Sequence, residues 1–182
     1  PPRGDLRPLF RFNGGKTRLV PFVETGLRLA LLRGGPGATY HEPFCGGAAV
    51  ALALGWPRTV LSDASPHVAE TYGAARDVPS LVAEHLAVLA GLTPEDDADH
   101  TFAHRGRQVR GPAFHAARAL HADGVRDPAA RAALFLYLMA RGFNGLLRVS
   151  RKTGALNVPC GDLAVPRYPT ADELRAYARL AA

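Results

Sequence analysis

Apolar residues in the first half of the chain fall into short runs that alternate with stretches of helical spacing. Short apolar runs bounded by turn residues are typical of strands, and apolar positions three or four apart are typical of helices. The pattern predicts these elements: helices over 17–32, 48–54, 66–76 and 79–90, and strands over 38–44 and 60–63. The order strand, helix, strand, helix predicts an α/β fold with a partial doubly wound, Rossmann-like sheet.

The second half of the chain has a different pattern. A polar stretch over 93–99 is interpreted as a connector. Asp127, followed by a proline, predicts the start of a helix that Gly142 ends. Thr170 and Glu173 have the spacing of a capping box, which predicts a final helix. We therefore expect the sheet unit to carry a mostly helical insertion.

The last part of this insertion contains a predicted β-hairpin. Its strands are expected over 146–149 and 155–158, around a basic loop at 151–154. We find no internal repeats or low-complexity tracts in the chain.

Positive charge is concentrated in the insertion. The chain has 22 Lys and Arg against 16 Asp and Glu, a formal net charge of +6. Residues 101–152 contain ten Lys and Arg against two acidic residues, a net charge of +8, so the remainder is net −2. Such a field suits an anionic partner such as nucleic acid. A solvated basic face with no ligand is the alternative.

Length and composition exclude several classes of protein. The 182 residues suffice for one domain with an insertion, and no apolar run approaches the roughly 20 residues of a membrane-spanning helix. The first residues carry no apolar signal core, so we expect no secretion. Cys45 and Cys160 are the two cysteines, too few for a disulfide framework. A reducing, cytoplasmic setting is expected.

The run 42–47, Glu-Pro-Phe-Cys-Gly-Gly, places glycines where a strand turns into a helix. Glycines there let a ligand approach the backbone amides of the following helix. Asp63 follows Glu42 by 21 residues at the end of the next predicted strand, a spacing that suits hydrogen bonds to ribose hydroxyls. The two features together favour a nucleotide-like ligand over an ordinary tight turn.

Two other patterns are interpreted as non-functional. The run 14–17, Gly-Gly-Lys-Thr, lacks the glycine that a phosphate-binding loop needs five residues before Gly15, where Phe10 stands. His100 and His104 are spaced as one helical turn and lie near acidic residues, but no third fixed ligand is evident. We expect surface histidines and no metal site.

The run 143–148, Phe-Asn-Gly-Leu-Leu-Arg, has the residue types of a DNA reader. An aromatic ring beside an amide suits insertion into a base stack, and an arginine suits bidentate contact with a guanine edge. Arg151 and Lys152 would then contact phosphates, which position a protein without specifying sequence. The alternative is that Phe143 and Leu146 form the core of a small hairpin.

Four runs, in this order, resemble the Dam family (class D12) of S-adenosylmethionine-dependent DNA adenine-N6 methyltransferases: 12–16, 41–47, 142–148 and 157–161. The resemblance implies a methyltransferase core over 1–93, a DNA target-recognition region over 94–165, and the start of the C-terminal part of the core over 166–182. It implies double-stranded DNA as the partner, S-adenosylmethionine as the cofactor, and location at the nucleoid.

The resemblance also assigns residues to roles. The expected cofactor-binding residues are Phe12, Gly14, Gly15, Lys16, Glu42, Pro43, Phe44, Gly46, Gly47 and Asp63. The expected DNA-binding residues are Phe143, Asn144, Leu146, Arg148, Arg151, Lys152 and Pro159. In this family Phe143 and Asn144 would insert near the target adenine, and Leu146, Arg148 and Pro159 would read flanking bases.

The family's catalytic tetrapeptide, Asp-Pro-Pro-Tyr, is absent from these 182 residues, so no catalytic residue is expected here. Ala48 also stands where a third glycine is usual, and Phe12 replaces a tryptophan. Three hypotheses follow. The chain is a Dam-like homologue that binds DNA and S-adenosylmethionine without methylating alone, a fragment of an active adenine methyltransferase, or a small-molecule Rossmann-type protein that uses the same cofactor.

Overall fold

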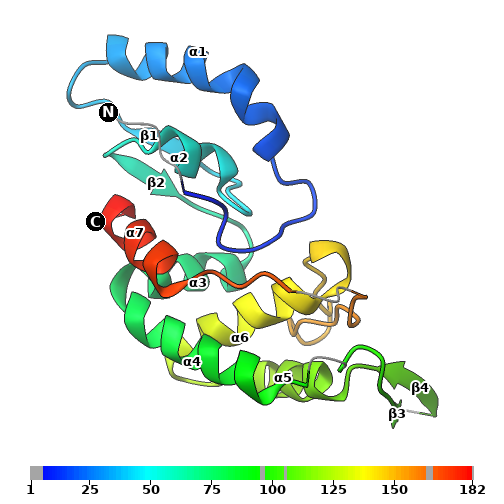
Figure 1. Ribbon diagram of the computed structural model, residues 1–182. Helices are drawn as coiled ribbons and strands as arrows, with labels where there is room; N and C mark the ends of the chain where they lie inside the picture. The colour runs from blue at the N-terminus through cyan, green and yellow to red at the C-terminus, as the bar shows by residue number, and fades with distance from the viewer. Residues whose placement is uncertain (1–5, 95–96, 105, 163–165, 182) are drawn as a thin grey trace.

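The computed structural model describes residues 6–94, 97–104, 106–162 and 166–181 (Figure 1). Its helices are α1 (Val20–Arg33), α2 (Ala49–Leu54), α3 (Pro66–Asp77), α4 (Pro79–Leu92), α5 (Pro112–Ala122), α6 (Pro128–Arg141) and α7 (Ala171–Ala181), with the short 3₁₀ turns η1 (Thr17–Leu19) and η2 (Phe143–Gly145). Its strands are β1 (Tyr40–Glu42), β2 (Thr59–Leu61), β3 (Thr101–His104) and β4 (Arg107–Arg110). In the described part of the chain, no helix combines the length and apolar character needed to cross a membrane.

Strands β1 and β2 form a parallel pair, with Tyr40 opposite Thr59 and Glu42 opposite Leu61. The chain passes from one to the other through α2, so the predicted order of strand, helix, strand and helix is confirmed. Figure 1 shows α1 on one side of this pair and α3 with α7 on the other. The result is a mixed α/β fold with small sheets.

The main core surrounds α6. This helix packs against α3, α4 and α5, and α7 packs against α3 and α4. Residues Leu134–Met139 are all buried, because α6 has neighbours on every side. The helix begins as predicted. The two carboxylate oxygens of Asp127 accept hydrogen bonds from the backbone amides of Ala129 and Ala130.

The predicted strands over 146–149 and 155–158 are wrong as regular strands. The chain does double back, but only Val149 and Leu156 form a bridge among the described residues of this segment. The Ser150 amide donates to the Ala155 carbonyl, and the Asn157 amide donates to the Arg148 carbonyl. The predicted basic loop is therefore present, flanked by a single bridge rather than by two regular strands.

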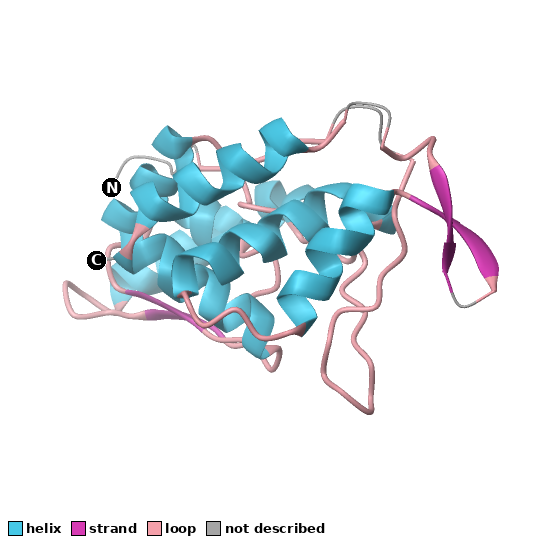
Figure 2. Cartoon of the chain, turned by 90° about the horizontal axis from the view of Figure 1, so that it is seen from below, coloured by secondary structure: helices cyan, strands magenta, loops and turns pink. Residues whose placement is uncertain are grey.

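An antiparallel ribbon and a helix lie where the sequence pattern predicted neither. Strands β3 and β4 pair with Phe102 opposite Val109, and they project from the helices (Figures 1 and 2). His104 lies in β3, so the helical spacing assumed for His100 and His104 is wrong. Helix α5 follows at once, after Gly111 in a left-handed conformation at φ 76°.

Candidate functional site

The turn between β1 and α2, residues 43–48, is the predicted ligand-binding turn and is called the glycine turn below. Gly46 has φ +46°, a left-handed conformation that glycine adopts without strain. Ala48 also has a positive φ, 52°, where a side chain is disfavoured. The Cys45 amide donates to the Ser62 carbonyl at 3.0 Å, which joins the turn to the end of β2. The turn is therefore a fixed structure.

Two predicted carboxylates hold this turn through backbone amides. Asp63 accepts from the Gly46 amide and from the Ser65 amide, each at 2.9 Å. Glu42 accepts from the Ala51 amide of α2 at 2.8 Å. Burial raises the pKa of Glu42, and the bond from Ala51 acts in the opposite direction. The carboxylates thus have partners within the chain, and their roles toward a ligand stay predictions.

The N-terminal loop, residues 6–16, brings Phe12 to the same turn. A Cβ atom added to Gly46 would lie 2.9 Å from the ring of Phe12, so only glycine allows the ring to pack so closely. Gly15 lies in the same loop, where its amide donates to the Phe12 carbonyl at 3.0 Å. The exposed Lys16 ammonium donates to the Gly14 carbonyl at 2.8 Å. The loop and the glycine turn form one structural unit.

Three further predicted residues have less defined surroundings. Phe44 is 84% exposed, and Pro43 is also exposed. The Pro43 carbonyl accepts from the Ser62 hydroxyl at 3.4 Å. Gly47 is buried, close to the Phe12 side chain and the Phe10 carbonyl. All ten predicted cofactor-binding residues therefore lie on the N-terminal loop, at the end of β1, on the glycine turn or just after β2.

The N-terminal loop also contacts the predicted DNA reader. The Asn13 amide donates to the Gly145 carbonyl at 2.9 Å. A Cβ atom at Gly145 would lie 2.7 Å from the side chain of Arg11, so this approach requires glycine. The loop thus lies between the glycine turn and the segment that follows α6.

The predicted DNA-reading residues lie together after α6. Phe143 is 46% exposed, and its amide donates to the Pro159 carbonyl at 3.0 Å. Asn144 is exposed with φ 53°, the left-handed conformation that asparagine tolerates better than most residues. Arg148 is exposed and Leu146 is half-buried. An aromatic ring, an amide and a proline are thereby presented side by side.

Arg151 and Lys152 are exposed in the loop that follows. The loop is closed on itself, since the Ser150 amide donates to the Ala155 carbonyl and the Gly154 amide to the Ser150 carbonyl, each at 2.8 Å. The two cations therefore lie on an ordered turn.

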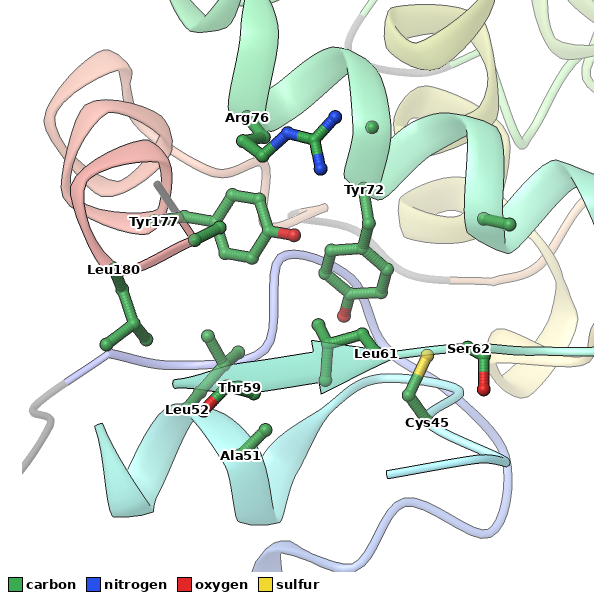
Figure 3. A pocket seen from close by; sticks show the side chains of 13 residues that line it. Cys45, Ala51, Leu52, Thr59, Leu61, Ser62, Tyr72, Arg76, Tyr177 and Leu180 are labelled. Atoms are coloured by element: carbon green, nitrogen blue, oxygen red, sulfur yellow. The ribbon is translucent and has the colours of Figure 1, made fainter. Parts of the chain in front are cut away.

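A cavity of about 280 Å³ lies next to the glycine turn, between β2, α3 and α7 (Figure 3). Tyr72 and Tyr177 point into it from the two helices, their ring centroids 5.3 Å apart. None of the ten predicted cofactor-binding residues lines it, but Cys45 of the glycine turn does, as do Ser62 and Ala51, whose amide donates to Glu42. Burial first, then the charges of Asp63 and Glu42, raise the pKa of Cys45 to about 12, so this thiol is a poor nucleophile.

The groups that support the basic region were not predicted from the sequence. Asp97, assigned to a polar connector, is fully buried and accepts from the Ala113 and Phe114 amides at the start of α5. Arg110, at the end of β4, pairs with Asp162. The only local signal was the Gly-Pro pair at 111–112, because Asp97 and Asp162 lie 16 and 52 residues from their partners.

Among the described residues, no group of three or more His, Cys, Asp or Glu is placed so that it could hold a metal ion. His104 instead packs near Phe102 and His115, with ring centroids 6.1 and 5.9 Å away. Burial, followed by the charge of Arg118, lowers the pKa of His115 to about 4.

Residues 12–182 match the family described as D12 class N6 adenine-specific DNA methyltransferase. The chain is 28% identical over 183 residues to a DNA adenine methylase of Haemophilus influenzae, covering 99% of this chain and 55% of that protein. It is 27% identical over 182 residues to a type II methyltransferase of Methanocaldococcus jannaschii, covering 97% and 59% respectively. A DNA adenine methylase of Vibrio cholerae is 27% identical over 175 residues, covering 96% and 54%. The chain spans about half the length of these relatives.

Proposed function

Because the chain belongs to the D12 class of N6 adenine-specific DNA methyltransferases, we propose that its 182 residues bind duplex DNA and S-adenosylmethionine. The observation that carries the proposal is the N-terminal loop, in which Phe12 packs on Gly46 while Asn13 bonds to Gly145. One short segment thereby joins the glycine turn to the DNA reader. In this proposal, residues 1–93 form the cofactor part and residues 94–165 read DNA.

The chemical types of the residues around the glycine turn suit S-adenosylmethionine. Asp63 supplies an acceptor at the end of β2 for ribose hydroxyls, and Phe12 supplies an aromatic surface beside the turn. Lys16 is exposed in the same loop and supplies a positive charge. When bound, the cofactor supplies an activated methyl group. This chain's residues orient it and hold it next to the reader.

The segment after α6 supplies the DNA contacts. Phe143 and Asn144 stand exposed at its start, and a ring of this kind can enter a base stack. Arg148 can donate two hydrogen bonds to one guanine edge, whereas Arg151 and Lys152 neutralise phosphates. The net charge of +8 over residues 101–152 supports an anionic partner for this region.

Methyl transfer by these residues alone is not part of the proposal. An adenine must be flipped out of the duplex and its amino group held toward the donor methyl, which the family assigns to the Asp-Pro-Pro-Tyr run. The 182 residues contain no Asp, Asn or Ser followed by two prolines and an aromatic residue. Binding is therefore the activity we assign.

The deciding experiment measures binding and transfer on one preparation. The chain is titrated with a mixed-sequence duplex at two salt concentrations and with S-adenosylmethionine, and methyl transfer is followed with labelled cofactor. We expect DNA binding that weakens by orders of magnitude as salt rises, cofactor binding that Asp63→Ala abolishes, and no transfer. Salt-independent DNA binding, or none, would contradict the DNA role and favour a small-molecule protein.

Arg148 offers a sharper test of base reading. Arg148→Ala should weaken binding to the preferred site by about 1–3 kcal/mol and flatten base preference there. Arg33→Ala, which removes an exposed arginine from the end of α1, is the matched control. Equal weakening on every sequence would assign Arg148 to phosphate instead.

A second candidate function has one observation in its favour. Since the relatives are nearly twice as long as the matched region, these residues would serve as the cofactor- and DNA-binding part of an active site-specific adenine methyltransferase. Methyl transfer that appears only when the remaining half of such a relative is added in trans would favour this candidate.

A further inference from the structure

A buried histidine connects the basic loop to the end of the predicted cofactor site. The Nε2 atom of His67, in the first turn of α3, lies 2.9 Å from the carbonyl oxygen of Gly154. The two residues are 87 positions apart in the chain, and His67 is only 8% exposed. We propose that His67 is a positioning residue that fixes the loop of Arg151 and Lys152 for contact with DNA. This inference rests on the DNA-binding role proposed above.

The partner atom determines the state of the imidazole. A carbonyl oxygen only accepts, so Nε2 must carry the hydrogen and donate it. The other ring nitrogen, Nδ1, is buried and has no hydrogen-bond partner among the described residues. The ring is held by packing against His121 and Phe135, with centroids 5.1 and 6.3 Å away. The donor is therefore directed at Gly154 by a rigid environment.

The bond acts at the point where the loop is closed. Gly154 ends the turn that carries the two cations, and its own amide returns to the Ser150 carbonyl. Side chains on a closed turn move with its backbone, so a bond at Gly154 orients Arg151 and Lys152 together. Ordering these cations before DNA arrives reduces the conformational entropy lost on binding.

The anchor also lies next to the predicted cofactor acid. Asp63 accepts the Ser65 amide, and α3 begins at Pro66, so His67 follows directly from that hydrogen-bonded segment. Displacement of this segment would be transmitted to the Gly154 carbonyl. The cofactor turn and the DNA-contacting loop therefore share one support at the start of α3.

The test uses two substitutions of His67, one that removes the hydrogen-bond donor and one that keeps a donor. His67→Phe keeps an aromatic ring of similar size and removes the hydrogen bond, whereas His67→Gln places an amide N–H near the position of Nε2. Three measurements are made on each protein: thermal midpoint, hydrogen exchange of residues 150–155 without DNA, and duplex affinity as a function of salt. His121→Phe is the control, because it alters the same aromatic cluster and leaves the bond intact.

We expect His67→Phe to speed exchange in residues 150–155 and to weaken duplex binding, each by up to about tenfold, the equivalent of one hydrogen bond. His67→Gln should restore both, and His121→Phe should change neither. In an Arg151→Ala and Lys152→Ala background, His67→Phe should cause no further loss of affinity, because the loop's cations are already gone.

Unchanged exchange in the loop of His67→Phe would overturn the anchor. So would a loss of affinity that His67→Gln fails to restore, or one that adds fully to the loss of the two cations. If the unsubstituted chain does not bind a duplex, the proposed function fails. The exchange measurement then still decides whether His67 holds the loop.

Discussion

Helices α1 and α6 each have 14 residues and a proline in the first turn, yet their environments are opposite. Only Leu31 is buried in α1, whereas α6 is buried at Ala129 and throughout 132–141. Apolar side chains of α1 remain in solvent, with Phe22 81% and Leu32 59% exposed. Similar local sequences therefore end in different surroundings, because burial depends on which neighbours the fold supplies.

The two parts of the molecule also differ in what holds them. The helical part is held by the main apolar core around α6, which continues into the strand part at Cys45, Ala48, Ala51 and Leu52. The strand part adds hydrogen bonds from the Glu42 and Asp63 carboxylates to backbone amides, and a small second cluster of Leu31, Leu54 and Trp56. Stability is expected to reside in the first part and the shape of the ligand turn in the second.

The largest expected effect tests this division directly. Leu136→Ala in α6 should lower the free energy of unfolding by about 2–5 kcal/mol, because Leu136 is fully buried and the substitution leaves a cavity. Leu32→Ala in α1 should change it by less than about 0.5 kcal/mol. Urea denaturation of both variants provides the measurement. Similar losses in the two helices would show that α1 is covered in solution.

Lowering the pH should reduce the stability of the helical part before that of the strand part. Burial, followed by the neighbouring His67 and Arg131, lowers the pKa of His121 to about 4 from an ordinary 6.5. Between these values the unfolded chain binds more protons than the folded one, so stability is constant above pH 6.5 and declines as pH falls toward 4. His115 acts in the same direction.

The thermal midpoint between pH 7 and pH 4 measures this effect, and hydrogen exchange locates it. Amides of α5 and α6 should lose protection before those of β1 and β2. His121→Phe should reduce the decline, since one of the two titrating groups is removed. An equal decline in that variant would assign the pH dependence to other groups.

The smallest effect concerns the strand part alone. Cys45 is 6% exposed and its pKa is raised to about 12, so at pH 8 it should react with a disulfide reagent at least about a hundredfold more slowly than an ordinary thiol. The Cys160→Ala variant isolates this thiol. Rapid reaction would mean that the glycine turn opens readily, contrary to the hydrogen bonds that hold it.

Much of the fold follows from short-range features of the sequence. The capping box is confirmed, because Thr170 and Glu173 exchange hydrogen bonds between side chain and backbone at 2.9 and 3.1 Å. The ribbon of β3 and β4 was missed because four alternating residues give too weak a pattern. Asp97 was misassigned because its partners begin 16 residues away.

The candidate site divides in the same way. Composition and spacing identified the glycine turn, Asp63 and the exposed residues after α6, and family membership is now established. Composition and spacing could not show that the Asp63 carboxylate accepts a hydrogen bond from the Gly46 amide, or that the Asn13 amide donates to the Gly145 carbonyl. Both contacts need segments far apart in sequence to be placed first.

The motifs of the sequence by itself indicated the family. The sequence also determined the positions of most helices, the caps of α6 and α7 and the glycine turn, because these depend on backbone preferences and hydrogen bonds over a few residues. Only the tertiary structure decided that α6 rather than α1 would be buried, that Cys45 and Ser62 rather than the predicted cofactor residues would line the cavity, and that His67 would reach Gly154. The reason is physical: burial and long-range hydrogen bonds depend on neighbours that only the packed chain brings together.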